Sequence, residues 1–151
     1  MIDKADRRVL QRLQAEGRIT NQDLAEATGL SASACWRRVK ALEESGVVRG
    51  YAALVDREKA GFSTAAILHV SLERHDARFV EEFERRVRER PEILDCYATT
   101  GDADYHLRVV VADVAAYNAL LDGFLFRLPG IRQVRTNVVL KEIKSGVALP
   151  L

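Results

Sequence analysis

The chain has 151 residues, of which 48% are hydrophobic and 30% charged, and its formal net charge is +1. This composition is typical of a globular protein with one domain or two small ones. No apolar run approaches the roughly 20 residues of a membrane-spanning helix, and the opening MIDKADRRVL is amphipathic, unlike a signal peptide. We therefore expect a cytoplasmic protein with no membrane partner.

Two cysteines, Cys35 and Cys96, lie far apart and in no ligand-like spacing. A disulfide framework or a zinc site is therefore not expected, and both positions are interpreted as buried. For Cys35 the expected role is that of a small core residue, with a redox switch as the alternative.

The first helix is expected to begin at the amino terminus. Asp3 can cap it, Val9, Leu10 and Leu13 make one apolar face, and Gly17 ends it. This helix would supply a second wall for the pair of helices that follows.

A helix-turn-helix pattern extends from Thr20 to Gly46. Thr20, with Asp23 three positions later, predicts a mutual cap in which each side chain accepts from a free amide. Gly29 can close this helix in the left-handed conformation, and Ser31 can cap the next one. The chain therefore reverses within a short turn, as in DNA-binding helix-turn-helix units.

The second helix of this pattern has two different sides. Cys35, Val39 and Leu42 fall on one stripe and are expected to face the core. The segment from Ser31 to Leu42 has three basic residues and no acidic one. The DNA-binding candidates, mostly on the opposite side, are Ser31, Ser33, Trp36, Arg37, Arg38 and Lys40. An ordinary solvated face is the alternative for this set. For Arg38, which lies nearer the core stripe than Arg37 and Lys40, pairing with a carboxylate inside the protein is a further alternative.

After this helix, the segment VVRGYAALVD alternates between apolar and polar residues and predicts a short hairpin or wing. Arg49 within it is interpreted as a solvated residue, with a DNA backbone contact as the alternative. The polar stretch DREKAGF marks a change of period, so residues 1–62 are expected to form a winged helix-turn-helix domain with its linker.

Residues 63–151 are expected to form a second domain with the order βαββαβ. The expected elements begin with a strand from Thr64 to Leu72 and a helix stopped near Pro91. Two strands over 93–100 and 105–111 follow, joined by the turn GDAD. The last elements are a helix capped by Asp113 and ended by Pro129 and Gly130, and a strand over 134–140. This order predicts an α+β, ferredoxin-like fold with both helices on one face of an antiparallel sheet.

The other face of this sheet is expected to be apolar. Ile67, Leu94, Val110 and Val139 fall on alternate positions of their strands. Because an apolar second face is normally covered, we expect a homodimer, and a two-fold protein suits a pseudo-palindromic site in double-stranded DNA.

The whole chain resembles the Lrp/AsnC family of amino-acid-responsive transcriptional regulators, the feast/famine proteins. The residues that carry the resemblance are the opening MIDKADRRVL, the block LSASACWRRVKALEESGVVRGYAALVD, the turn TGDADYHLRV and the passage LPGIRQVRTNVVLKEIK. The resemblance implies a winged helix-turn-helix, a sensing domain, dimers that assemble into octamer-like discs, and control by a small amino acid.

The resemblance also implies where the effector binds, which is between dimers at the turn before the third strand of the sensing domain. The residues carried over are Thr100, Gly101, Asp102 and Asp104, with Thr136, Asn137 and Val138 on the last strand. A carboxylate suits the amino group of the effector, and glycine-freed amides with a hydroxyl suit its carboxylate. The alternative for Gly and Asp is that a tight hairpin simply needs them.

An enzyme is not expected, and neither a catalytic residue, a cofactor nor a resident metal is predicted. His69, His75 and His106 have no motif-like spacing, although a metal shared by His69 and His106 with Asp102 or Asp104 is an alternative. The closer alternative is an architectural DNA-bending protein of the nucleoid that senses no metabolite.

Overall fold

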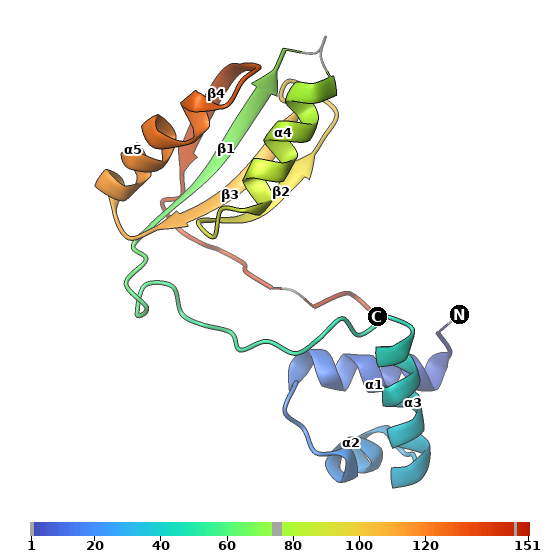
Figure 1. Ribbon diagram of the computed structural model, residues 1–151. Coiled ribbons are helices and arrows are strands. Elements are labelled where there is room, and N and C mark those ends of the chain that lie inside the picture. The colour runs from blue at the N-terminus through green and yellow to red at the C-terminus, as the bar shows by residue number, and fades with distance from the viewer. Residues whose placement is uncertain (1, 74–76, 147) are drawn as a thin grey trace. The chain divides into compact units, whose positions relative to one another are not determined.

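A computed structural model describes residues 2–73, 77–146 and 148–151 (Figure 1). The chain folds into two compact units, one of Met1–Leu54 with Ile143–Leu151 and the other of Val55–Glu142. The sequence pattern predicted a continuous second domain over residues 63–151. In the structure, Ile143–Leu151 groups with the first unit, and we call it the return segment.

The first unit holds three helices, α1 (Lys4–Ala15), α2 (Asn21–Thr28) and α3 (Ala32–Glu44). Their buried side chains form one core that includes the inner stripe expected for α3. The core residues are Val9, Leu10, Leu24, Ala25, Cys35 and Leu42. Burying these side chains against one another is what makes three short helices stable together.

Capping residues set the ends of these helices largely as expected. Asp3 forms a capping box with Asp6, and Gly29 ends α2 with a φ of 68°. Ser31 then accepts from the Ala34 amide at the start of α3. The pair at α2 differs from the prediction, because the Asp23 carboxylate accepts from the Thr20 hydroxyl rather than from the Thr20 amide.

The hairpin expected within VVRGYAALVD is not formed. Among the described residues, 47–56 contain no strand, and Leu54 is 88% exposed. Tyr51 donates from its hydroxyl to Glu43, which fastens this extended segment to the end of α3. The prediction failed because a short two-stranded ribbon is barely stable without a further strand or a helix to pack on.

The second unit is a sheet covered by helices. Its elements are β1 (Thr64–Leu72), α4 (Ala77–Arg88), β2 (Ile93–Ala98), β3 (Tyr105–Val111), α5 (Val114–Gly123), a 3-10 turn η1 (Leu125–Arg127) and β4 (Ile131–Val138). The strand order is β2-β3-β1-β4 with antiparallel pairs, and both helices lie on one face, as expected (Figure 1).

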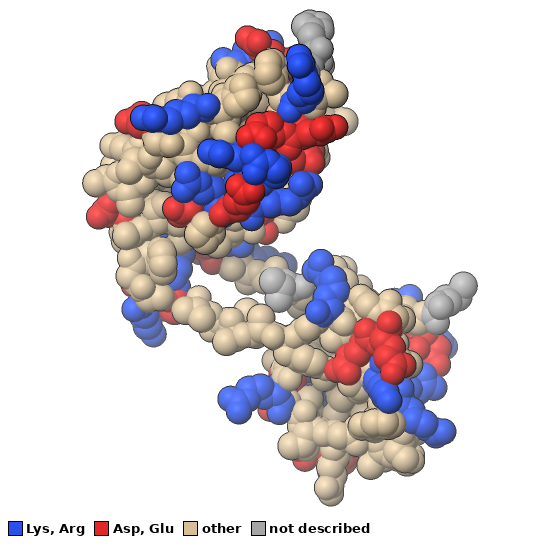
Figure 2. All heavy atoms as spheres, viewed as in Figure 1, with Lys and Arg blue, Asp and Glu red and all other residues tan. Residues whose placement is uncertain are grey.

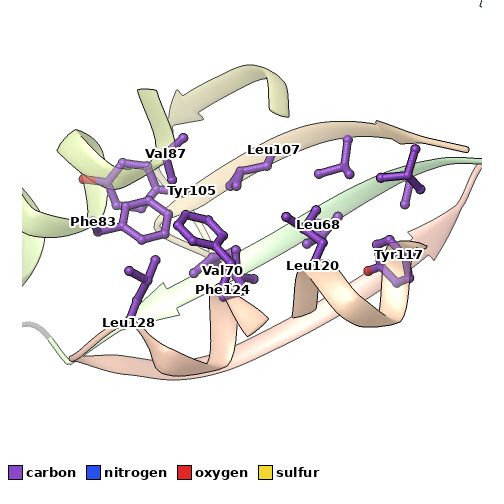
Figure 3. Packing of buried hydrophobic residues seen from close by; sticks show 14 of the residues in the cluster. Leu68, Val70, Phe83, Val87, Tyr105, Leu107, Tyr117, Leu120, Phe124 and Leu128 are labelled. Carbon is purple, nitrogen blue, oxygen red and sulfur yellow. The ribbon is translucent and has the colours of Figure 1, made fainter. Parts of the chain in front are cut away.

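The core of this unit lies between the helices and the sheet. The alternate β1 residues Ala66, Leu68, Val70 and Leu72 are all at most 3% exposed. They pack against Phe83 and Val87 of α4, Tyr117 and Leu120 of α5, and Phe124 (Figure 3). The period-two pattern in the sequence therefore identified the buried face of β1.

The ends of α5 and β4 differ from the prediction. Helix α5 ends at Gly123, and the chain tightens into η1 before Pro129, which brings Phe124 and Leu125 into the core. Strand β4 ends at Val138, and Leu140 is 97% exposed. The last bond to β1 runs from the Val139 amide to the Ala65 carbonyl, beyond which β1 offers β4 no further partner.

The second face of the sheet is more polar than expected. Ile67 pairs with Arg108 and Asn137, and His69 pairs with His106 and Arg135. Residues paired directly across strands share a face, so the apolar positions alternate with charged and polar ones. Leu94 lies at a register shift in β2 and is 50% exposed, and Val139 follows the end of β4.

Candidate DNA-binding face and effector site

The outward side of α3 presents aromatic and basic side chains to solvent. Trp36 is 54% exposed, and Arg37 and Lys40 are exposed beside it, while Cys35 behind them is fully buried. Ser31 and Ser33 are exposed at the start of the helix, with their hydroxyl oxygens 3.4 Å apart. The helix therefore separates a core side from a side that can enter a DNA groove.

Lys40 is held close to its own helix. Its ammonium lies 5.1 Å from the centroid of the Trp36 ring and 3.7 Å from the Glu44 carboxylate. Both partners are exposed, so these contacts are weak and a phosphate can replace them.

Arg38, one of the expected DNA-binding residues, is instead paired inside the unit, which is the alternative that its position near the core stripe left open. Its guanidinium bonds the carboxylates of Asp3 and Asp6 at 2.8 and 2.7 Å. The Asp6 amide and, next, Arg38 hold the pKa of Asp3 below its usual value. Arg38 thus joins α3 to the start of α1 and orients the helix. The other two basic candidates, Arg37 and Lys40, are exposed instead.

The turn before β3 is held in place by its own residues. Gly101 has a φ of 123°, which favours glycine. Asp104 donates from its amide to the Val70 carbonyl, and its carboxylate accepts from the Leu72 amide at 2.8 Å. Asp104 is therefore part of the connection between the turn and β1. Thr100, Gly101 and Asp102 are exposed.

The candidates on β4 do not converge. The Thr136 hydroxyl is bonded to the Tyr117 hydroxyl at 2.6 Å, on the face covered by α5. Asn137 lies on the opposite face, with its amide nitrogen 3.2 Å from His69 Nε2, and Val138 is 55% exposed. The turn residues precede β3, which is separated from β4 by β1, across two strand spacings of about 4.8 Å each. One chain thus presents two separate groups of effector candidates.

A groove between α4 and β2 was not expected from the sequence. It has a volume of about 510 Å³, and Glu84, Arg88, Asp95, Cys96 and Tyr105 are among its lining residues. The Tyr105 hydroxyl donates to Glu84, and burial together with this bond raises the pKa of Tyr105 to about 12. The only sequence signal was the amphipathic pattern of α4, which does not show where a groove opens.

The outer side of α4 carries charges of both signs, which gather together in Figure 2. Arg85 bonds Glu82 and Glu89, and Arg88 bonds Glu84. Pairs three and four positions apart on an exposed helix are the usual arrangement of a solvated surface.

Two other expectations concern metals and thiols. In the part of the chain that the structure describes, no group of three or more His, Cys, Asp or Glu side chains is placed to hold a metal ion. His69 and His106 meet edge to face with ring centroids 4.6 Å apart, whereas His75 lies outside the described residues. Cys35 is buried as expected, but Cys96 is half-buried, and burial raises the pKa of its thiol to about 11.

Comparison with known proteins accounts for both units. Residues 2–49 match the family of winged helix-turn-helix DNA-binding domains, and residues 65–149 match that of Lrp/AsnC ligand binding domains. The chain belongs to the Lrp/AsnC family. It is a DNA-binding transcriptional regulator with a ligand-binding domain.

Relatives in this family cover the chain almost completely. The Bkd operon transcriptional regulator of Pseudomonas aeruginosa is 38% identical over 99% of this chain and 98% of its own. The leucine-responsive regulatory protein of Escherichia coli K12 is 38% identical over 96% of this chain and 88% of its own. These relatives are transcriptional regulators, which are not enzymes.

Solved structures in the family have the same fold. A transcriptional regulator of Neisseria meningitidis in complex with L-Met has a TM-score of 0.95 and 39% identity, covering 99% of this chain and 97% of its own. An AsnC family transcriptional regulator of Agrobacterium tumefaciens has a TM-score of 0.93 and 36% identity, covering 99% and 97%. Within the described ranges, no helix has the length and apolarity needed to cross a membrane.

Proposed function

We propose that this regulator binds pseudo-palindromic double-stranded DNA as a homodimer that assembles further, to an octamer or a similar particle, and that a small amino acid controls this assembly. The observation that carries the proposal is the two-sided helix α3, with Cys35 fully buried and Trp36 half exposed, in a chain whose second unit matches a ligand binding domain. Such a regulator acts in the cytoplasm, on DNA of the nucleoid.

On α3, Ser31, Ser33, Trp36, Arg37 and Lys40 are the residues proposed to contact DNA. Arginine and lysine neutralise phosphates or read guanine, and the serine hydroxyls bond phosphate oxygens. Arg38 is reassigned from direct contact to orientation, because Asp3 and Asp6 already bind its guanidinium.

For the effector, Asp102 is the best-placed anionic partner of an amino group. Asp102 is exposed in the turn. Among the described hydrogen bonds, it takes part through its backbone carbonyl, which accepts from the Ser71 hydroxyl. The adjacent Thr100 and Gly101 offer a hydroxyl and an open backbone for the effector carboxylate. Asp104 positions this turn through Leu72.

The distance between the two groups of effector candidates supports a site completed by a second copy. The turn on one protomer and one face of β4 on another, with either Asn137 or Thr136 and Val138, would together surround a ligand that one chain cannot enclose. An effector that prefers one assembly shifts the population toward it and changes how many α3 helices reach their half-sites together.

Thermal unfolding of the purified protein against each standard amino acid tests the effector. A ligand at about one hundred times its dissociation constant adds roughly 2.7 kcal/mol to the stability of the state that it binds. Relatives named for leucine and solved with L-Met make L-leucine and L-methionine the first two probes.

The variant Asp102→Asn should abolish that stabilisation while leaving the unfolding temperature without amino acid unchanged. Asp122→Asn, an exposed carboxylate on α5, is the matched control and should retain the response. If no amino acid stabilises the protein at millimolar concentration, the sensing proposal is wrong and the architectural alternative takes its place. DNA binding by α3 is tested separately, with duplex DNA and Arg37→Ala.

A further inference from the structure

The return segment is bound to α1 by side chains on one face of the helix. The Gln14 side-chain amide donates to the Leu149 carbonyl at 3.2 Å, and its oxygen accepts from the Leu149 amide at 2.6 Å. Gln11, three positions earlier, donates to the Leu151 carbonyl. A glutamine that both donates to and accepts from one backbone residue reproduces the pairing of a neighbouring strand.

Apolar packing accompanies these bonds. Leu151 is partly buried against the core of Val9, Leu10, Leu24 and their neighbours. Its amide donates to the Leu149 carbonyl at 3.0 Å, so the chain bends tightly and turns Leu151 onto the helices. The segment is thus attached by side-chain hydrogen bonds and by an apolar contact.

The chain therefore connects the two units twice. The first connection crosses from unit to unit at Leu54 and Val55, and the second crosses back at Glu142 and Ile143, shortly after β4 ends at Val138. A single extended linker allows a domain to rotate freely, whereas a second attachment restricts that rotation.

We call the first unit, which holds α1, α2 and α3, the DNA-binding unit, and the second, Val55–Glu142, the sensing unit. We propose that the return segment is a strap that attaches the sensing unit to the DNA-binding unit a second time, through α1. The strap joins β4, which carries three of the effector candidates, to the helix whose Asp3 and Asp6 hold Arg38 of α3. Release of the return segment from α1 would therefore leave the linker at Leu54 and Val55 as the one remaining connection between the units. The strap requires no effector, so it goes beyond the proposed function.

Trp36 is the single tryptophan of the chain and lies in the DNA-binding unit, so its fluorescence anisotropy decay reports how freely that unit rotates. In the intact protein we expect the slow rotation of the whole assembly to dominate the decay. Gln14→Ala, and separately a chain that stops after Ser145, should add a component of several nanoseconds from independent rotation of the unit.

Hydrogen exchange measures docking of the strap directly. The Leu149 amide should be protected in the intact protein, and Gln14→Ala should speed its exchange about tenfold because its acceptor is removed. Asn118→Ala replaces another helical amide side chain, on α5, and should leave the anisotropy decay and the exchange unchanged. Circular dichroism establishes that each variant keeps its helices.

Two results would overturn the proposal. One is a Leu149 amide that exchanges in the intact protein as fast as in an unstructured peptide. The other is an anisotropy decay that is the same with and without residues 146–151, in a variant that keeps its helices. Neither result bears on whether α3 binds DNA or whether an amino acid stabilises the protein, so the strap and the proposed function fail independently.

Discussion

Arg37 and Arg38 are neighbours in sequence but differ in what their side chains contact. Arg37 is exposed on the outward side of α3, while Arg38 bonds two carboxylates of the first turn and cap of α1. On a helix, adjacent residues are separated by about 100°, so one step along the chain is enough to change from an exposed side chain to an internal ion pair.

Arg37→Ala should weaken DNA binding without changing the unfolding temperature of the protein. If Arg37 reads a base, the loss should be about 1–3 kcal/mol and confined to the specific site; if it holds a phosphate, all sequences should weaken similarly. Titrations against specific and scrambled duplexes at several salt concentrations separate the two cases.

Arg38→Ala is the matched comparison and should lower the unfolding temperature, because Asp3 and Asp6 lose their shared cation. Its DNA affinity should fall only through the orientation of α3. A normal unfolding temperature with lost DNA binding would show instead that Arg38 contacts DNA directly.

At the scale of elements, Gly130 decides how the chain enters β4. It has a φ of 76°, and a Cβ atom there would lie 2.6 Å from Cδ2 of Phe79 on α4. The glycine therefore serves both the left-handed backbone and the close approach of a helix.

Gly130→Ala should lower the free energy of unfolding by about 1–2 kcal/mol for the backbone, with about 1–3 kcal/mol more for the clash. Gly123→Ala, at the end of α5 with open space around it and no positive φ, should instead stabilise by about 0.5–1 kcal/mol. Urea unfolding of both variants measures the difference; equal midpoints would contradict the close contact with Phe79.

The hydroxyl pair of Tyr117 and Thr136 joins α5 to β4. Tyr117→Phe should cost about 0.5–1.5 kcal/mol of stability, and the double variant with Thr136→Val should cost less than the sum of the two single changes. Additive costs would mean that the bond does not form in solution. Thermal shifts with amino acids on the same variants show whether Thr136 also contacts the effector.

Features that depend on near neighbours were predictable from the sequence. The caps at Asp3, Ser31 and Asp113 each act within three residues, so a short pattern identifies them. The buried face of β1 followed from alternation alone, and the inner position of Arg38 from the helical period. These features fixed most element boundaries to within a few residues.

Features that depend on distant partners were not predictable. The bond between Gln14 and Leu149 joins residues 135 positions apart. In the sequence, Gln14 belongs to an ordinary exposed helix and Leu149 to an apolar chain end, and neither pattern indicates a partner. Apolar and polar residues alternate over 47–56 as in a hairpin, but in the structure this segment forms no strand pair. On the second sheet face, Ile67 and Val110 suggested an apolar surface, yet the intervening polar residues became neighbours only through strand register.

At the scale of the whole molecule, that second face should make the stability of the fold sensitive to pH. Burial, the neighbouring His106 and Arg135 lower the pKa of His69 below its usual 6.5. Arg108 and Asp95, which bond each other, are the other charged groups on this face of β3 and β2. A lowered pKa means that the folded state prefers neutral His69, so acid works against folding.

We therefore expect the stability of the fold to decrease as the pH falls from above 6.5 through the lowered pKa of His69, and this group to have no effect at higher pH. Thermal unfolding at pH 7.5 and 5.5 measures the change, and His69→Gln should reduce it. The same acid-induced change in that variant would assign the effect to other groups.

The return segment also has a consequence for how the protein is made. The ribosome completes residues 1–54 first, and the helices of that unit can fold around Val9, Leu24 and Cys35 while the rest is still being synthesised. Leu149 and Leu151 reach α1 only after the entire sensing unit has emerged. A nascent chain, or one truncated before Leu149, would thus carry folded α1, α2 and α3 without the hydrogen bonds that join the return segment to α1.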